Sequence, residues 1–307
     1  MTVHPVQGML LVLTAAALWG TTGTAQSLVP SSLSSAWVGA LRLVGAALFF
    51  AAWLAWAGSR HLRWPALRAL PWRGVVAAAA AMTVYNLAFF AGVRASGVAV
   101  GTAIALGSAP VWAGLLQAAA GRQVPQALWW AGTALAVAGG VLMILGGGAI
   151  ARFTPAGVGL CLLAGLAYAA YTLVNKHLVA AAAPALVTGA VFGLAATLAV
   201  PLAGALAGPL LLRQADMAVM AWLGVMATGV AYLLFSHGLR HVSGATAVAL
   251  ALAEAVTAFV LAWAVVGERP GGAALAGLCV LLAGLALVIR AEMRAVVPLS
   301  STPATLA

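Results

Sequence analysis

Charged side chains are scarce in this sequence. Of 307 residues only 6% are Asp, Glu, Lys or Arg, while 65% are hydrophobic. A soluble domain of this length carries roughly 25% charged residues. Because so few charges cannot cover a surface that faces water, the composition excludes a soluble globular protein and predicts an integral membrane protein.

Carboxylates are the rarest charge, with 4 Asp and Glu against 14 Lys and Arg. The sequence also lacks the HExxH, GxSxG and GxxxxGK[ST] motifs of zinc peptidases, serine hydrolases and P-loop ATPases. The single aspartate, Asp216, falls in a loop between apolar runs. We therefore expect no enzymatic activity, no cofactor and no ATP hydrolysis, which leaves secondary or passive transport.

Two further absences narrow the choice of partners and ligands. Cys161 and Cys279 lie in separate apolar runs without a CxxC motif or a nearby His pair, so neither a disulfide framework nor a metal site is expected. The net charge of +10 is spread over scattered arginines that form no basic arm or face. This distribution is typical of short cytoplasmic loops in an inner-membrane protein and does not favour binding to nucleic acid.

Ten apolar runs are long enough to cross a bilayer, which needs about 20 residues per helix. We predict an all-α integral membrane protein from them, with a disordered tail over 295–307. The first run is too long for the core of a signal peptide and is counted as a spanning helix. The runs cover residues 8–28, 35–57, 73–94, 97–119, 126–147, 155–178, 184–207, 217–240, 244–266 and 271–291.

The distribution of Lys and Arg between loops predicts the orientation of the chain. Nine of these residues lie in the loops after even-numbered runs or near the C-terminus, and four lie in the loops after odd-numbered runs. Since cytoplasmic loops carry the excess of positive charge, both termini are predicted to be cytoplasmic. Much of the bias comes from one loop, which contains Arg60, Arg63 and Arg68.

An internal repeat divides the ten runs into two sets of five. Landmarks recur in the same order at offsets of 145 to 149 residues, although Gly- and Ala-rich helices can also resemble one another by chance. A repeat with an odd number of spans enters the membrane from opposite sides, so we expect two inverted halves, 1–150 and 151–294, around a central cavity. The matched landmarks are Gly8, Trp19 and Gln26 with Gly157, Tyr168 and Asn175, then Gly92 with Gly238, Gly121 with Gly267, Gly132 with Gly277, and Gly139 with Gly284.

Several short motifs in this arrangement resemble the EamA-type members of the drug/metabolite transporter superfamily. The resemblance covers residues 8 to 291 and implies a ten-helix inverted repeat that exports amino acids and other metabolites. Within that superfamily the sequence is most similar to YddG-type exporters of aromatic amino acids. Ala255 departs from the pattern, because the family often has proline after the glutamate. The motifs are Leu18-Trp19-Gly20, Leu41-Arg42-Leu43, Ser108-Ala109-Pro110-Val111, Ala253-Glu254-Ala255-Val256 and Gly267-Glu268-Arg269-Pro270.

Ionisable residues are few inside the predicted spans. His237, Lys176 and His177 lie near predicted cytoplasmic ends and are interpreted as interfacial, which leaves Arg42 and Glu254. Such groups are costly in lipid unless they are paired or hydrated, so each is a candidate for function. Glu254, near the middle of the ninth run, either exchanges a proton or contacts substrate, or it pairs with a helix end and only holds helices together. Arg42 either binds a substrate carboxylate bidentately or extends to the interface near the start of its helix.

Aromatic and amide side chains within the spans form a second group of candidates. A ring with a polar edge suits a cavity for an amphipathic solute, because the face stacks and the edge forms hydrogen bonds. The alternatives are packing or polar contacts between helices. Trp19 and Tyr168 match across the repeat, so they are predicted to lie on opposite sides of one site. The candidates are Trp19, Tyr85, Asn86, Trp112, Tyr168, Tyr171, Asn175 and Tyr232.

The sequence therefore predicts a secondary transporter in a bacterial inner membrane that exports small amphipathic metabolites by alternating access. Amino acids, aromatic ones first, are the expected substrates, and membrane lipid is the expected surrounding of a monomeric chain. Alternatives are a channel-like facilitator, an exporter of another solute such as a drug or a nucleotide-like metabolite, and a membrane-embedded enzyme. The last would need a nucleophile, metal cluster or acid pair at membrane depth, and none is visible.

Overall fold

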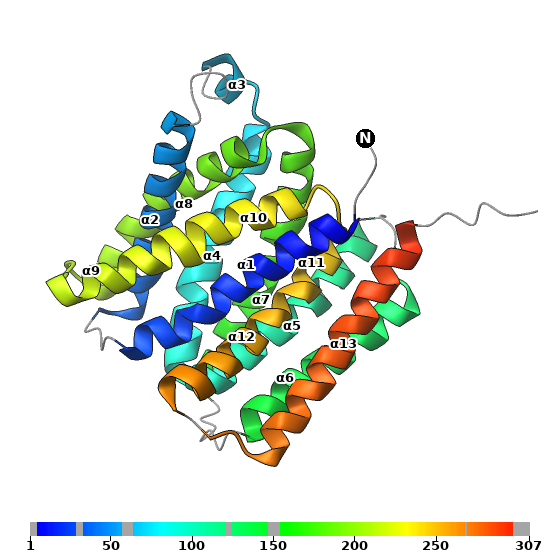
Figure 1. Cartoon of the computed structure of the whole chain (residues 1–307). Helices are drawn as coiled ribbons and strands as arrows, with labels where there is room; N and C mark the ends of the chain where they lie inside the picture. The colour runs from blue at the N-terminus through cyan, green and yellow to red at the C-terminus, as the bar shows by residue number, and fades with distance from the viewer. Residues whose placement is uncertain are drawn as a thin grey trace, which may run out of the picture.

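The computed structural model describes residues 5–28, 33–56, 64–120, 124–146, 154–267 and 269–296. Those residues are almost entirely helical, and they contain no strand. Within the described ranges, ten helices are long and apolar enough to cross a membrane (Figure 1). The predicted all-α membrane fold with ten spans is thus confirmed.

Eight spans are single α-helices, and a short helix, α3 (Trp64–Arg68), lies between the second and third spans. The last helix continues into the tail predicted from 295, and residues 297–307 lie outside the described part, as does the predicted boundary at 150. The eight helices are α1 (Pro5–Leu28), α2 (Ser35–Trp56), α4 (Trp72–Ser96), α5 (Val98–Ala119), α6 (Ala127–Gly146), α7 (Pro155–Ala181), α8 (Pro184–Ala207) and α13 (Gly272–Val296).

The eighth and ninth spans change helix type partway along their length. The eighth consists of α9 (Gln214–Ala221), a π-helical segment η1 (Trp222–Val230) and α10 (Ala231–Gly238). The ninth consists of α11 (Gly244–Leu250), a 3-10 turn η2 (Ala251–Ala253), α12 (Glu254–Leu261) and a π-helical end η3 (Ala262–Val266). Because π-helical and 3-10 segments within helices often occur at functional sites, these two spans are of particular interest.

The packing of α6 against α13 shows that the two halves are inverted. A Cβ added to Gly139 would lie 2.7 Å from the carbonyl oxygen of Gly277, and one added to Gly132 would lie 2.9 Å from that of Gly284. Residue numbers rise along one helix as they fall along the other, so the helices are antiparallel. At the offset of 145 residues, Gly132 corresponds to Gly277 and Gly139 to Gly284. The Gly139–Gly277 contact therefore corresponds to the Gly132–Gly284 contact, as a two-fold axis in the membrane plane requires.

Contacts between the other spans follow the same symmetry. Helix α7 packs on α4 and α5, and its counterpart α1 packs on the matching eighth and ninth spans. Helices α2 and α8, the second spans of the two halves, pack on each other. The core therefore lies between the halves and contains residues from both of them.

The ends of the bundle can be identified from these contacts. Gly8, near the start of α1, packs against Gly238 and Val242, whereas Gly146, at the end of α6, packs against Ala273 and Ala274. Helix α1 begins and α13 ends at the same end of the bundle, here called the N-terminal end (Figure 1). Helix α6 ends at the opposite end.

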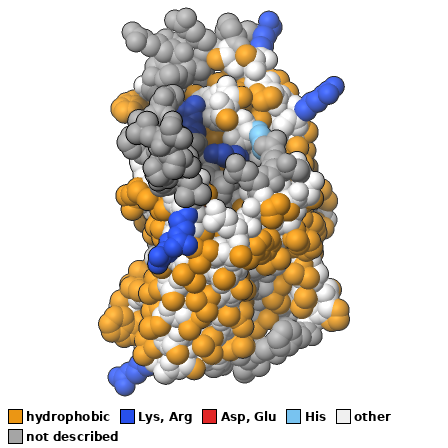
Figure 2. All heavy atoms as spheres, turned by 90° about the vertical axis from the view of Figure 1, so that its right-hand side faces the viewer, with side chains coloured by type: hydrophobic (Ala, Val, Ile, Leu, Met, Phe, Trp, Pro, Cys, Tyr) orange, Lys and Arg blue, Asp and Glu red, His pale blue; other side chains and the backbone are white. Residues whose placement is uncertain are grey.

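The outer surface is apolar. On the face shown in Figure 2, hydrophobic side chains cover most of the area. Large apolar residues are exposed on many spans, with Leu48 at 65%, Leu206 at 70% and Trp263 at 61%. Since such exposure in water would be a liability, we attribute this surface to contact with lipid.

Candidate functional site

Aromatic side chains from both halves meet at the centre of the bundle. The ring centroids of Trp19 on α1 and Tyr168 on α7 lie 6.1 Å apart in an edge-to-face arrangement. Trp19 also lies 5.0 Å from Tyr232 and 5.3 Å from Phe235, both on α10. Tyr85 on α4 lies 5.3 Å from Tyr168. Trp19 and Tyr168, which were predicted to lie on opposite sides of one site, are thus in direct ring contact, and their role in binding stays a prediction. We call these five residues the aromatic cluster.

Arg42 enters the core beside this cluster from α2. Its side chain is only 6% exposed, and its guanidinium carbon lies 5.5 Å from the ring centroid of Phe90. Its Nε donates a hydrogen bond to Thr228 Oγ1 at 3.2 Å. Among the described residues, the terminal nitrogens have no hydrogen bond or ion pair. Arg42 is thus held by one edge while its other nitrogens remain available to a ligand.

Thr228 is suited to this role by the local helix geometry. It lies in the π-helical segment η1, and its hydroxyl donates to the carbonyl oxygen of Leu223, five residues earlier, at 2.6 Å. The hydroxyl hydrogen is therefore used within the helix, which directs a lone pair toward Arg42. Thr228 thus belongs to the π-helical segment and also forms the hydrogen bond with Arg42.

Glu254 lies at the start of α12, directly after the 3-10 turn η2. Its side chain is half-buried, and in the described part of the chain its carboxylate has no hydrogen bond or ion pair. Arg42 is the cation near enough to interact with it electrostatically, and Tyr85 lies within reach of both charges. Gly20 of α1 packs against the Glu254 backbone, where any larger residue would clash.

Tyr171 and Asn175 form a polar network next to the aromatic cluster. The Asn175 amide donates to the Tyr171 hydroxyl at 3.2 Å and to Ser236 Oγ at 3.1 Å. Thr188 on α8 donates to the same Ser236 oxygen at 2.8 Å. The network joins α7, α8 and α10 on the side of the cluster nearer the N-terminal end.

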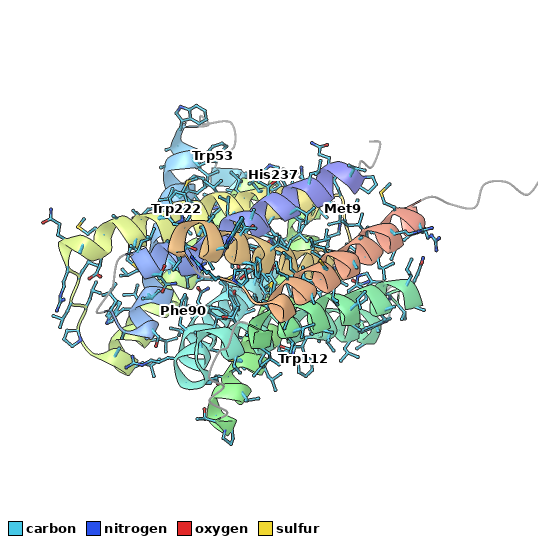
Figure 3. All side chains as sticks on the ribbon, turned by 60° about the horizontal axis from the view of Figure 1, so that its bottom comes forward. Met9, Trp53, Phe90, Trp112, Trp222 and His237 are labelled. Carbon is cyan, nitrogen blue, oxygen red and sulfur yellow. The ribbon has the colours of Figure 1, made fainter. Side chains whose placement is uncertain are left out.

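The other two aromatic and amide candidates lie outside the cluster. The Asn86 amide donates to the carbonyl of Met82 in its own helix, and the Asn86 backbone packs against Gly39 of α2. No ring contact in the described residues joins Trp112 to the cluster, and Figure 3 places Trp112 well away from Phe90. Their roles in substrate binding stay untested predictions.

Two polar atoms at the centre, the indole nitrogen of Trp19 and Oδ1 of Asn175, are buried without a partner among the described residues. The Tyr168 hydroxyl is buried beside the Thr172 hydroxyl, which is its side-chain partner. A buried polar group without a partner costs about 1–3 kcal/mol. These groups and the two charged side chains without a direct partner make the centre of the bundle the candidate functional site.

Sequence reasoning missed three important residues. Thr228 and Phe90, which hold Arg42, carry no signal because threonine and phenylalanine are ordinary in membrane helices. Glu292, near the end of α13, is buried and accepts hydrogen bonds from Ser243 and Thr246. Its charge could have marked it as a candidate. In the described ranges, no three His, Cys, Asp or Glu side chains lie together as a metal site would require.

Comparison with known proteins identifies the family. The EamA-like transporter family matches residues 6–145 and again residues 155–290. The chain belongs to the EamA-like transporter family. It is therefore a multi-pass membrane transporter, and the two family matches coincide with the two structural halves. The chain is also 38% identical over 287 residues, 93% of its length and 94% of the relative, to a Bacillus subtilis (strain 168) protein named "Uncharacterized transporter YwfM".

A solved crystal structure has the same fold. It matches with a TM-score of 0.77 and 20% sequence identity, covering 94% of this chain and 98% of the other. At this identity the likeness supports the architecture of this EamA-like transporter and carries no information on its substrate.

Proposed function

We propose that this EamA-like transporter exports zwitterionic amino acids, aromatic ones first, across the bacterial inner membrane by alternating access. The observation that carries the proposal is the pair Arg42 and Glu254. The two opposite charges come from different halves, lie beside the same aromatic cluster and have no ion-pair partner among the described residues.

An amino acid complements this pair. Its carboxylate would accept hydrogen bonds from the free nitrogens of Arg42, which match a carboxylate in planar, bidentate geometry. Its ammonium group would donate to Glu254. Charges inside a bilayer are costly unless they are paired, so a zwitterion that bridges both residues replaces two unpaired charges by two paired ones.

The aromatic cluster favours an amphipathic side chain. Trp19 and Tyr168 offer ring surfaces. Trp19 also carries a buried indole N–H without a partner among the described residues, and Tyr168 a buried hydroxyl beside Thr172. Aromatic rings in edge-to-face or offset contact contribute about 0.5–1.5 kcal/mol beyond the area that they bury. Aromatic amino acids are therefore expected to bind more tightly than aliphatic ones of similar size.

The inverted halves provide a mechanism for movement across the membrane. Since Arg42 belongs to the first half and Glu254 to the second, rocking of one half against the other would open the bound solute to one side at a time. The resemblance to exporters supports the outward direction. The excess of Lys and Arg in loops on the side of the termini supports a cytoplasmic location for both termini.

Flux measurements in proteoliposomes test the proposal. Liposomes that contain the purified protein should take up or release labelled phenylalanine or tryptophan with saturable kinetics, and Arg42→Gln should remove most of the flux. Gly193→Ala, which adds a methyl group where nothing lies within 4 Å, is the control that should retain it. Absence of protein-dependent flux for every amino acid would overturn the substrate assignment, and flux that does not saturate would favour a channel.

A further inference from the structure

The two ends of the bundle are packed differently although the halves are related in sequence. Tyr171 and Asn175 of α7 match Thr22 and Gln26 of α1 at an offset of 149 residues. Tyr171 and Asn175 are fully buried toward the N-terminal end, whereas Thr22 and Gln26 are half-buried toward the opposite end. A symmetric state of the transporter would bury both pairs alike.

Hydrogen bonds repeat this asymmetry. At the N-terminal end, Asn175 and Thr188 join α7, α8 and α10 through Ser236. The amide of Gln26 donates to the Thr22 carbonyl in its own helix at 3.2 Å, and no bond from it to another helix is found among the described residues. The N-terminal end thus joins α7, α8 and α10, whereas in the described residues no side-chain bond joins the matching helices α1, α2 and α4 to one another. Bonds across helices at the opposite end run from Trp222 to Thr21 and from Trp37 to the Gly208 carbonyl.

Helix packing agrees with the hydrogen bonds. Helix α7 packs against α8, α10 and α11. The matching contacts would join α1 to α2, α4 and α5, and comparable packing between those helices is absent from the described part of the chain. The structure is therefore closed at the N-terminal end and looser at the opposite end.

Glu292 is the carboxylate at the closed end among the described residues, where Lys176 and Arg240 also bond to carbonyl oxygens of neighbouring segments. Its carboxylate, on α13, accepts hydrogen bonds from the Ser243 backbone N–H at 2.7 Å, the Ser243 hydroxyl at 3.1 Å and the Thr246 hydroxyl at 2.6 Å. Gln117 of α5 accepts another from the N–H of Ala245 at 3.3 Å. The first turn of α11 is thus capped by side chains of two other helices, which satisfy donors that a helix start leaves free.

Among the described residues of the first half, the matching helix α5 begins without a side-chain cap. At offsets of 145 to 147, residue 292 matches Leu145, Gly146 or Gly147, and none of these has a side-chain acceptor. Ser96 matches Ser243 at the offset of 147, and its buried hydroxyl has no partner among the described residues. The carboxylate cap therefore distinguishes the closed end from the looser one.

A partly open pocket of about 90 Å³, lined by both polar and apolar side chains, lies beside the Glu292 cap. It has room for several water molecules, since each needs roughly 10–15 Å³. Trp129 also lines it, is only 3% exposed and has an indole N–H without a partner in the described residues. The cavity gives the carboxylate space when α11 moves away.

We propose that Glu292 is a latch that holds the N-terminal end of the bundle closed by capping α11. The transport cycle breaks its bonds to Ser243 and Thr246 when the central site opens to that end. The inference rests on the proposed alternating access, but it concerns the conformation of the protein and applies to any substrate.

Cysteine labelling in nanodiscs, which leave both ends accessible, tests the latch without substrate. The background is Cys161→Ala/Cys279→Ala, with one reporter cysteine at a time. Ser236→Cys reports on the closed end and Thr22→Cys on the opposite end, and a hydrophilic maleimide is the probe. Thr246→Val should raise the labelling rate of Ser236→Cys about tenfold, as loss of one hydrogen bond to a charged group can change an equilibrium constant, and Glu292→Gln at least as much. Labelling of Thr22→Cys should stay equal or fall.

Thr197→Val is the matched control, because the Thr197 hydroxyl bonds only within its own helix and is exposed. It should change neither rate. Unchanged labelling of Ser236→Cys in Glu292→Gln would overturn the latch, and so would an equal rise at both reporters, which indicates general destabilisation. Failure of amino acid flux would refute the proposed substrate and leave this result standing.

Discussion

The close crossing of α6 and α13 makes a quantitative prediction for Gly139→Ala. The added Cβ would lie 2.7 Å from the carbonyl oxygen of Gly277 and closer still to the backbone nitrogen of Leu281. Backbone atoms cannot rotate away, so the two helices must separate. Small residues allow such close packing in membranes, where contact between helices supplies much of the stability. Overpacking of this kind costs about 1–3 kcal/mol.

Gly140→Ala is the matched control, since its Cβ would meet only the Leu281 Cδ1 atom at an ordinary 3.7 Å. Both changes alter helix propensity equally, so the difference isolates the clash. The apparent Tm in detergent, measured by the loss of monodisperse protein on heating, should be lower for Gly139→Ala by roughly 2–10 °C. Gly284→Ala, the change at the symmetry-related position, should cost a similar amount. Equal Tm values for Gly139→Ala and Gly140→Ala would refute the close backbone contact between α6 and α13 at Gly139.

Three further predictions concern the central site. Thr228→Val removes the acceptor of Arg42 Nε and should raise the KM for amino acid flux about fivefold or more, whereas Thr228→Ser should restore it. Glu254→Gln should abolish any dependence of flux on a proton gradient, and a gradient dependence equal to that of the wild type would reject a coupling role. Tyr168→Phe removes a buried hydroxyl whose side-chain partner is Thr172, so the Tm should change little while the KM increases; an unchanged KM would limit Tyr168 to packing.

The number of spans and their inversion could be predicted from the sequence, for a physical reason. The length of an apolar run is set by the thickness of the bilayer, and an odd number of spans per repeat forces inversion. The same symmetry indicated that Trp19 and Tyr168 face one central region, but it did not predict their direct ring contact.

The direction in which each helix faces was harder to predict. In a soluble helix an apolar stripe marks the buried face, but in these spans nearly every position is apolar and the stripe is missing. Asn86 and Tyr85 are neighbours in sequence, yet Tyr85 joins the cluster while Asn86 packs toward α2. Sequence analysis could therefore name suitable residue types, but it could not predict which of these residues contact one another in the folded protein.

Polar contacts between residues far apart in the sequence could not be predicted either. Glu292 and Ser243 are 49 residues apart, and nothing in either neighbourhood indicates the pairing. The irregular helix segments at Thr228 and before Glu254 depend on tertiary packing in the same way. In both spans the irregular segment lies at a residue that the proposed mechanism uses.

The central claim is that one site holds both charges of an amino acid, and ligand binding to the purified protein tests it most directly. Tryptophan should raise the apparent Tm in a saturable manner, because a ligand that binds only the folded state stabilises it. Tryptamine, which lacks the carboxylate, and indole-3-propionate, which lacks the ammonium group, should each give a much smaller shift. A shift from either analogue as large as that from tryptophan would contradict the account.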